Sequence, residues 1–122
     1  MKRGPETDLQ RMQEEVRRFC EERQWDRFHS AKDLAIGIAV EAAELLELFR
    51  FLSPDEVEEM MRRKADRRRV ADEMADILAF LLRLAQRYRI DLEKAFADKM
   101  DDNRRKYPVE RARGTNRKHT HL

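Results

Sequence analysis

Residues 34–49, LAIGIAVEAAELLELF, and residues 70–82, VADEMADILAFLL, are the two most hydrophobic stretches of this chain. Each carries apolar residues three and four positions apart, the spacing that aligns side chains along one face of an α-helix. The first stripe consists of Leu34, Ile38, Leu45 and Leu48. The second consists of Val70, Ile77 and Phe80 and continues to Leu84, just beyond the second stretch. The two stretches therefore predict two long helices that bury these faces.

Acidic residues interrupt both stripes. These are Glu41 and Glu44 in the first stretch, and Glu73 and Asp76 in the second. Because residues three apart on a helix point to nearly the same side, each pair shares a helix face, and we expect all four acids to be buried in one pocket. Buried carboxylates without a partner are costly and repel one another, so the pattern predicts a cation site. Oxygen ligands without histidine or cysteine favour Mg²⁺, with Mn²⁺ as an alternative.

The composition predicts one all-α domain. A chain of 122 residues has the size of a single domain, so we expect residues 1–122 to form it. Flexible or partner-contacting tails are expected at about residues 1–6 and 109–122. Three glycines, three prolines and few strand-type runs predict an almost wholly helical protein.

Charge and cysteine content narrow the class of protein further. Charged residues make up 43% of the chain but the net charge is only +2, so bulk charge does not indicate a nucleic-acid partner. The single cysteine, Cys20, cannot form an internal disulfide. No apolar run has the length of a signal peptide or a membrane span, so we expect a cytoplasmic protein without a membrane partner.

Capping residues and apolar spacing set the expected helix boundaries. The expected long helices span about residues 8–23, 31–51, 66–89 and 92–105, and a short polar helix runs from Pro54 to about Lys64. The expected N-caps are Thr7 or Asp8, Ser30, Ser53 and Asp91. Residues 24–30 are expected to form a connector, and the basic segment after Pro108 is expected to lack structure of its own.

Two further motifs flank the acid pairs. The motif WDRFH, residues 25–29, precedes the first pair, and KMDDNRRKYP, residues 99–108, follows the second. With these motifs, and with the stretches QWDRFHSAKDLAIGIAVEAAELLELF and DEMADILAFLLRLA, the chain resembles the MazG-like all-α nucleoside triphosphate pyrophosphohydrolases. The resemblance is closest to their dCTP pyrophosphatase subgroup and covers about residue 9 to the end of the chain.

The resemblance implies hydrolysis of nucleoside triphosphates between the α and β phosphates, giving a nucleoside monophosphate and pyrophosphate with the help of Mg²⁺. It implies that the four acids are catalytic metal ligands, namely Glu41, Glu44, Glu73 and Asp76. It also implies that Glu47, one helical turn further, orients or deprotonates the attacking water or completes the ligand shell. Metal ions between the acids and the triphosphate would neutralise both and lower the pKa of a bound water. We therefore expect a nucleotide-pool house-cleaning enzyme that favours dCTP-like substrates.

The resemblance assigns base recognition to the aromatic connector, which contains Trp25, Phe28 and His29. The alternative for Trp25 and Phe28 is that they plug the gap between two helices. Phe51 and Phe80 stand where close dCTP-specific relatives carry tryptophan and tyrosine, and Val16 stands where they carry histidine. Because these replacements remove polar groups, we expect a looser pocket that accepts several deoxynucleotides.

The resemblance places the motif of residues 99–108 against the triphosphate. The residues expected to bind substrate there are Lys99, Asn103, Lys106 and Tyr107. Cationic and amide donors suit phosphate and sugar oxygens. For Lys99, an ordinary surface lysine on an exposed helix is an equal alternative.

Other interpretations of the charged residues remain open at this stage. Each acid, and Glu47 above all, has the alternative of a solvated surface group. A di-iron carboxylate bundle would require E-x-x-H pairs, and no histidine follows a glutamate at that spacing. The alternative function is a non-catalytic helical interaction module whose basic segment contacts nucleic acid, with Arg62, Arg63, Arg67, Arg68 and Arg69. Because acids interrupt that segment, a solvated connector is favoured.

The predicted fold is an antiparallel four-helix bundle completed by oligomerisation. Two helices rich in leucine, isoleucine and phenylalanine cannot both be covered within one small subunit. The resemblance implies a homotetramer built as a dimer of dimers.

Overall fold

The computed structural model describes residues 4–122, and the described residues form helices and no strand. The all-α expectation is therefore confirmed. The elements are α1 (Asp8–Glu22), η1 (Asp26–Phe28), α2 (Ala31–Phe49), α3 (Pro54–Met60), α4 (Lys64–Arg87), α5 (Leu92–Lys106), α6 (Val109–Ala112) and η2 (His119–His121), where η denotes a 3₁₀ helix. The chain divides into two compact units, one ending at Arg89 and the other beginning at Ile90. Of the tail expected at residues 1–6, residues 1–3 lie outside the described residues.

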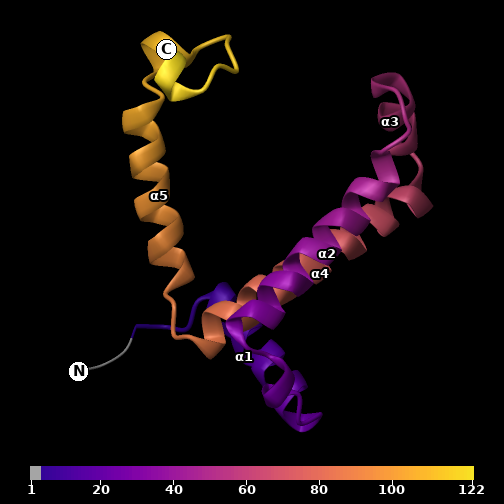
Figure 1. Ribbon diagram of the computed structural model, residues 1–122, viewed down its shortest axis with the longest axis vertical. Helices are drawn as coiled ribbons and strands as arrows, with labels where there is room; N and C mark the ends of the chain where they lie inside the picture. Colours follow the sequence, from indigo (N-terminus) through magenta and orange to yellow (C-terminus); the bar gives the residue numbers. More distant parts are fainter. Residues whose placement is uncertain (1–3) are drawn as a thin grey trace. The chain divides into compact units, whose positions relative to one another are not determined.

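The first unit is organised around α2 and α4. These helices run in opposite directions and lie side by side, joined through α3 at one end (Figure 1), and α1 packs against α4. The buried apolar side chains of the described residues are Cys20, Leu34, Met60, Val70, Leu82 and Ala85. Both predicted stripes are shielded from water, because Leu34 of α2 and Val70 of α4 are buried and the other members of the stripes are half-buried.

Large apolar side chains also remain exposed on the two long helices. They are Ile36, Val40 and Leu46 on α2, and Met74, Leu78 and Leu81 on α4. Covering them requires another surface. No helix within residues 4–122 combines the length and the apolar composition needed to cross a lipid bilayer.

Local hydrogen bonds begin the helices close to where the sequence predicted. Capping boxes at Thr7, Ser30 and Ser53 begin α1, α2 and α3, and Asp91 accepts from the Lys94 amide at the start of α5. The ends of α2 and α3 fall earlier than expected. The Leu52 amide donates to the Phe49 carbonyl at 3.0 Å, closing a turn that ends α2 before Ser53.

The segment after Pro108 is ordered, so the expectation that it lacks structure is wrong. The Pro108 carbonyl accepts from the amides of Arg111 and Ala112 at 3.0 and 2.9 Å, which forms the single turn of α6. The ring of His119 in η2 meets the edge of the Tyr107 ring, with centroids 5.6 Å apart. Proline at the N-cap and this aromatic contact organise a segment whose composition alone suggested disorder.

Replacing Ser30 by alanine is expected to lower the free energy of unfolding by about 1 kcal/mol. The Ser30 hydroxyl accepts from the Asp33 amide at 3.1 Å and begins α2, one of the two helices around which the first unit is organised. Urea unfolding followed by circular dichroism measures this loss. The matched control is Ser53→Ala, which removes the same cap from the seven-residue helix α3 and is expected to cost less. An unchanged midpoint in Ser30→Ala would contradict the expectation.

Candidate metal centre

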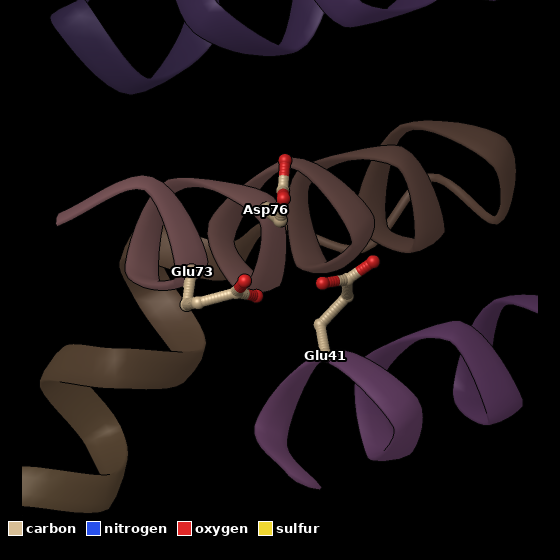
Figure 2. A group of neighbouring side chains, drawn as sticks. All are labelled: Glu41, Glu73 and Asp76. Carbon is tan, nitrogen blue, oxygen red and sulfur yellow. The ribbon is translucent and has the colours of Figure 1, made fainter. Parts of the chain in front are cut away.

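Three of the predicted acids come together where α2 and α4 are adjacent. One carboxylate oxygen from each of Glu41, Glu73 and Asp76 lies within 4.8 Å of the others. Figure 2 shows that Glu41 extends from α2 toward α4, whereas Glu73 and Asp76 occupy successive turns of α4. The cluster therefore depends on the packing of two helices that are separate in sequence.

Two oxygen atoms of this cluster are shielded from water. Oε2 of Glu41 and Oε2 of Glu73 are buried, and neither has a hydrogen-bond partner among the described residues. A buried carboxylate oxygen without a donor loses its hydration and gains nothing in return. Because no arginine or lysine within residues 4–122 donates to these atoms, the cluster suits a cation supplied from outside the chain.

The acids also perturb one another. The pKa of Glu41 is raised to about 7, chiefly by burial and then by hydrogen bonding of the protonated carboxyl group to Glu44 and Glu73. The negative charges of Glu44 and Asp76 add to the effect. Near neutral pH, a cation and a proton therefore compete for Glu41.

Without divalent metal, the protein is expected to lose stability as the pH rises from about 5 to about 8. The pKa of Glu41 is raised in the folded state, so the folded protein holds a proton that the unfolded chain has already released. Stability is therefore greatest below the unfolded pKa of Glu41 and falls as the pH passes through about 7. After allowance for screening by water, the loss is roughly 1 kcal/mol, or about 4 °C in Tm.

Thermal melting in a chelating buffer measures this slope. In Glu41→Gln, which has no proton to release at this position, the slope is expected to flatten. An equal slope in both proteins would assign the pH dependence to other groups.

The remaining predicted acids are more open to solvent. The expectation of burial holds for the oxygen atoms of Glu41 and Glu73, but Glu44 and Asp76 are exposed. Glu47 is also exposed and accepts from the Arg50 guanidinium at 3.1 Å, outside the three-acid cluster.

A groove of about 720 Å³ adjoins the acids. Glu41 and Asp76 contribute to its lining together with three of the predicted base-contacting residues, Trp25, His29 and Phe80. Val16, Phe19 and Leu78 are among the apolar side chains that complete it. The groove thus joins carboxylates and aromatic rings in one cavity, as binding of a base together with a charged group requires.

Two other aromatic residues predicted to contact the base do not line this groove within the described residues. Phe28 is 55% exposed beneath the Arg27 guanidinium, and Phe51 is 82% exposed beside Arg50. Phe51 follows the end of α2, so it lies beyond the part of that helix that packs on α4.

The end of α1 positions Trp25. Gln24 adopts a left-handed backbone conformation with φ of 55°, and the Trp25 amide donates to the Cys20 carbonyl at 3.0 Å. This is a Schellman ending of a helix, which brings the residue after the turn back onto the last turn of the helix. The Trp25 ring accordingly packs edge-on against Phe19, with centroids 5.6 Å apart.

The sequence interpretation missed Arg83. Arg83 is 1% exposed in α4 and donates to Nδ1 of His29, to Oε1 of Gln86 and to Oδ1 of Asp26. It thereby ties the aromatic connector to α4. The available signal was an arginine inside the apolar run FLLRLA, residues 80–85, where a charge requires partners.

Gly37 was also missed, although it fixes how closely α2 approaches Phe80. A methyl group at Gly37 would lie 2.6 Å from Cε1 of Phe80, well inside van der Waals contact. The Phe80 ring therefore fills the space that the absent side chain leaves. A glycine inside a helix costs stability, and this close contact accounts for its presence.

The predicted phosphate-contacting residues belong to the second unit. Lys99, Asn103 and Lys106 lie on α5 at the four- and three-residue spacing of one helix face, and Tyr107 follows directly. Asn103 is half-buried, whereas Lys99 and Lys106 are exposed. The structure thus places these residues together within their own unit.

Comparison with known proteins agrees with this geometry. The sequence model of the MazG-like family matches residues 36–122, a range that contains both acid pairs. The chain belongs to the MazG-like family. This MazG-like protein is 36% identical to human dCTP pyrophosphatase 1 over 119 residues, which is 98% of this chain and 70% of the human protein. The rat dCTP pyrophosphatase 1 has the same identity and coverage.

A solved structure extends the similarity to three dimensions. The crystal structure of a pyrophosphatase from Archaeoglobus fulgidus superimposes with a TM-score of 0.79 and 35% sequence identity. The match covers 88% of the MazG-like protein and 99% of the archaeal chain. The predicted MazG-like all-α fold is therefore confirmed.

Proposed function

We propose that this MazG-like protein hydrolyses nucleoside triphosphates to a monophosphate and pyrophosphate, uses Mg²⁺, and favours dCTP-like deoxynucleotides. The enzyme class is confirmed by its relatives, because they are named as pyrophosphatases over most of this chain. The use of Mg²⁺ is supported by the acid cluster, whose two buried oxygen atoms have no hydrogen-bond partner among the described residues. Removal of unwanted triphosphates from the nucleotide pool is the role that this activity would serve.

The donor set fits a hard divalent cation. Glu41, Glu73 and Asp76 would hold it, with Glu44 as the fourth ligand on the exposed side, and all offer carboxylate oxygen, which Mg²⁺ prefers. When bound, Mg²⁺ would neutralise triphosphate charge and make a bound water more acidic. Glu47 would orient or deprotonate the attacking water, or complete the ligand shell.

The groove supports the proposed position of the nucleobase. Trp25, His29 and Phe80 line the same cavity as Glu41 and Asp76, so a base held by the rings would leave its triphosphate near the acids. The lining of the groove is mostly apolar and includes Val16 and Phe80 at positions where polar side chains would increase selectivity for one base. This lining favours binding of several deoxynucleotides over binding of one. Phosphate and sugar oxygens are proposed to be contacted by Lys99, Asn103 and Lys106 of α5 and by Tyr107, which follows this helix.

A homotetramer completes the proposal. The exposed apolar side chains of α2 and α4 form faces that a second copy of the chain would cover. Sedimentation equilibrium measures the assembly directly. A monomer at micromolar concentration would contradict this part of the proposal.

A panel of ribo- and deoxynucleoside triphosphates tests the activity. Purified protein with Mg²⁺ is expected to release pyrophosphate and monophosphate, fastest with dCTP and related deoxynucleotides, and a chelator is expected to stop the reaction. Replacement of Mg²⁺ by Mn²⁺ is expected to retain activity. Release of inorganic phosphate without pyrophosphate, or no turnover of any nucleotide, would contradict the proposal.

The alternative of a nucleic-acid-binding module is disfavoured by ion pairing. Arg63 and Arg69 pair with Asp66 at 2.6 and 3.6 Å, and Arg68 pairs with Asp72 at 2.9 Å. These acids neutralise much of the basic segment before a polyanion could do so. Calorimetry with nucleotide and with oligonucleotide separates the two functions, because the enzyme requires Mg²⁺ for nucleotide binding.

A further inference from the structure

The buried cation Arg83 is part of the lining of the aromatic groove. Arg83 belongs to α4 and is 1% exposed. Its guanidinium donates hydrogen bonds to other residues of the first unit. Its Nε donates to Nδ1 of His29 at 3.0 Å, and Nη1 donates to Oε1 of Gln86 at 2.7 Å. Its Nη2 donates to Oδ1 of Asp26, which also faces Arg87 at 3.8 Å. The guanidinium is therefore held in one orientation by three partners.

This orientation determines the protonation of His29. An arginine side chain has donors only and stays protonated, so Nδ1 of His29 must accept and cannot carry a hydrogen. A neutral imidazole with an unprotonated Nδ1 carries its proton on Nε2. His29 is thus a neutral ring with one donor, and its ring lines the groove beside Trp25.

The charges around His29 favour the same state. Burial lowers the pKa of His29, and the positive charges of Arg83 and Arg87 lower it further. Asp26 and Asp33 act in the opposite direction but do not reverse the shift. The neutral ring is therefore the form present near neutral pH.

We infer that Arg83 is a positioning residue that fixes His29 with its proton on Nε2, so that the groove offers a hydrogen-bond donor to the nucleobase. The substrate contact rests on the proposed function, whereas the tautomer rests on the geometry alone. The base edge that meets His29 must then carry an acceptor, either a carbonyl oxygen or an unprotonated ring nitrogen. A base that presents an amino group there would face donor against donor and bind poorly.

The tautomer is tested first, on protein without metal or nucleotide. Nitrogen NMR of the histidine rings distinguishes a protonated from an unprotonated nitrogen, and the loss of one pair of signals in His29→Gln assigns His29 among the three histidines. The expected result is an unprotonated Nδ1 and a protonated Nε2 at neutral pH. A proton on Nδ1, or on both nitrogens, would overturn the inference, and this measurement does not require any variant of Arg83 to fold.

A matched pair of variants tests the role in binding. Arg83→Gln retains an amide nitrogen at the same distance along the side chain as Nε, whereas Arg83→Met has the same length without a donor. Both lose the guanidinium contacts to Asp26 and Gln86, so their losses of stability are comparable. Arg87→Met is the external control, because Arg87 faces Asp26 from the same helix without a hydrogen bond to His29.

With the triphosphate of the panel that is hydrolysed fastest, Arg83→Met is expected to raise KM about tenfold, because one hydrogen bond to the base is lost. Its kcat is expected to stay within about twofold of that of the unsubstituted protein. Arg83→Gln and Arg87→Met are expected to keep KM within about threefold of the unsubstituted protein. Equal KM values in Arg83→Met and Arg83→Gln would overturn the role in binding. If the protein hydrolyses no triphosphate, the proposed function is wrong. The nitrogen NMR of His29 still shows in that case whether Arg83 sets the tautomer.

Discussion

Replacing Glu41 by glutamine, or Asp76 by asparagine, is expected to lower kcat by more than about a hundredfold while the fold is retained. A hundredfold is the upper range for a residue that only orients a metal ligand, and these two residues are proposed as ligands themselves. Steady-state release of pyrophosphate measures the loss. Calorimetry with Mg²⁺ alone is expected to show weakened binding in both variants, which ties the loss to the metal.

Thermal melting of Glu41→Gln adds a second expected result. Without metal and above about pH 7, this variant is expected to be more stable than the unsubstituted protein, because one of several neighbouring negative charges is removed. The matched control is Asp72→Asn, on the same helix as Glu73 but exposed and paired with Arg68 at 2.9 Å. It is expected to keep full activity. Full activity in Glu41→Gln and Asp76→Asn would refute the ligand assignment.

Replacing Gly37 by valine is expected to destabilise the protein by about 1–3 kcal/mol, the usual cost of extra bulk in a packed core. The first carbon of any side chain at this position would lie 2.6 Å from the Phe80 ring, so α2 and α4 must separate or the ring must turn into the groove. Either movement also disturbs the alignment of Glu41 with Glu73. The midpoint of urea unfolding is therefore expected to fall, and the affinity for Mg²⁺ is expected to decrease.

The control for this variant is Ala39→Val, an equal β-branched residue on the exposed side of α2. It does not meet Phe80, so it is expected to cost only the helix-propensity difference between alanine and valine, about 0.5 kcal/mol. Valine has a higher helix propensity than glycine, so a loss of stability in Gly37→Val cannot come from propensity. If Gly37→Val and Ala39→Val are equally stable, the contact between Gly37 and Phe80 does not set the spacing of α2 and α4.

The acid pairs show how far helical spacing alone can reach. Residues three apart share a helix face whatever surrounds them, so Glu73 and Asp76 were predicted to lie together and do. The contribution of Glu41 followed from its position in an apolar stripe. Spacing did not predict that Glu44 and Asp76 remain exposed, because exposure depends on how far the partner helix extends beside each turn.

The aromatic residues proposed to contact the base do not all lie at the groove. Trp25, His29 and Phe80 line the groove as expected, but Phe28 and Phe51 point to solvent within this chain. A short connector and a helix end can direct a ring either way, since their backbone is not periodic. Which of these rings lie at the groove is therefore not encoded in their spacing along the chain.

Taken by itself, the sequence determined the helices, their capped starts and the faces they bury, because apolar spacing and capping boxes act within a few residues. Three features were decided only by the tertiary structure: the loss of water from two carboxylate oxygens, the hydrogen bond from Arg83 to His29, and the order of the residues after Pro108. The first two outcomes depend on contacts between segments far apart in the chain, and the third on the turn at Pro108 and the contact of Tyr107 with His119. The spacing of α2 and α4 at Gly37 and Phe80 sets the first of them, and no local pattern encodes it.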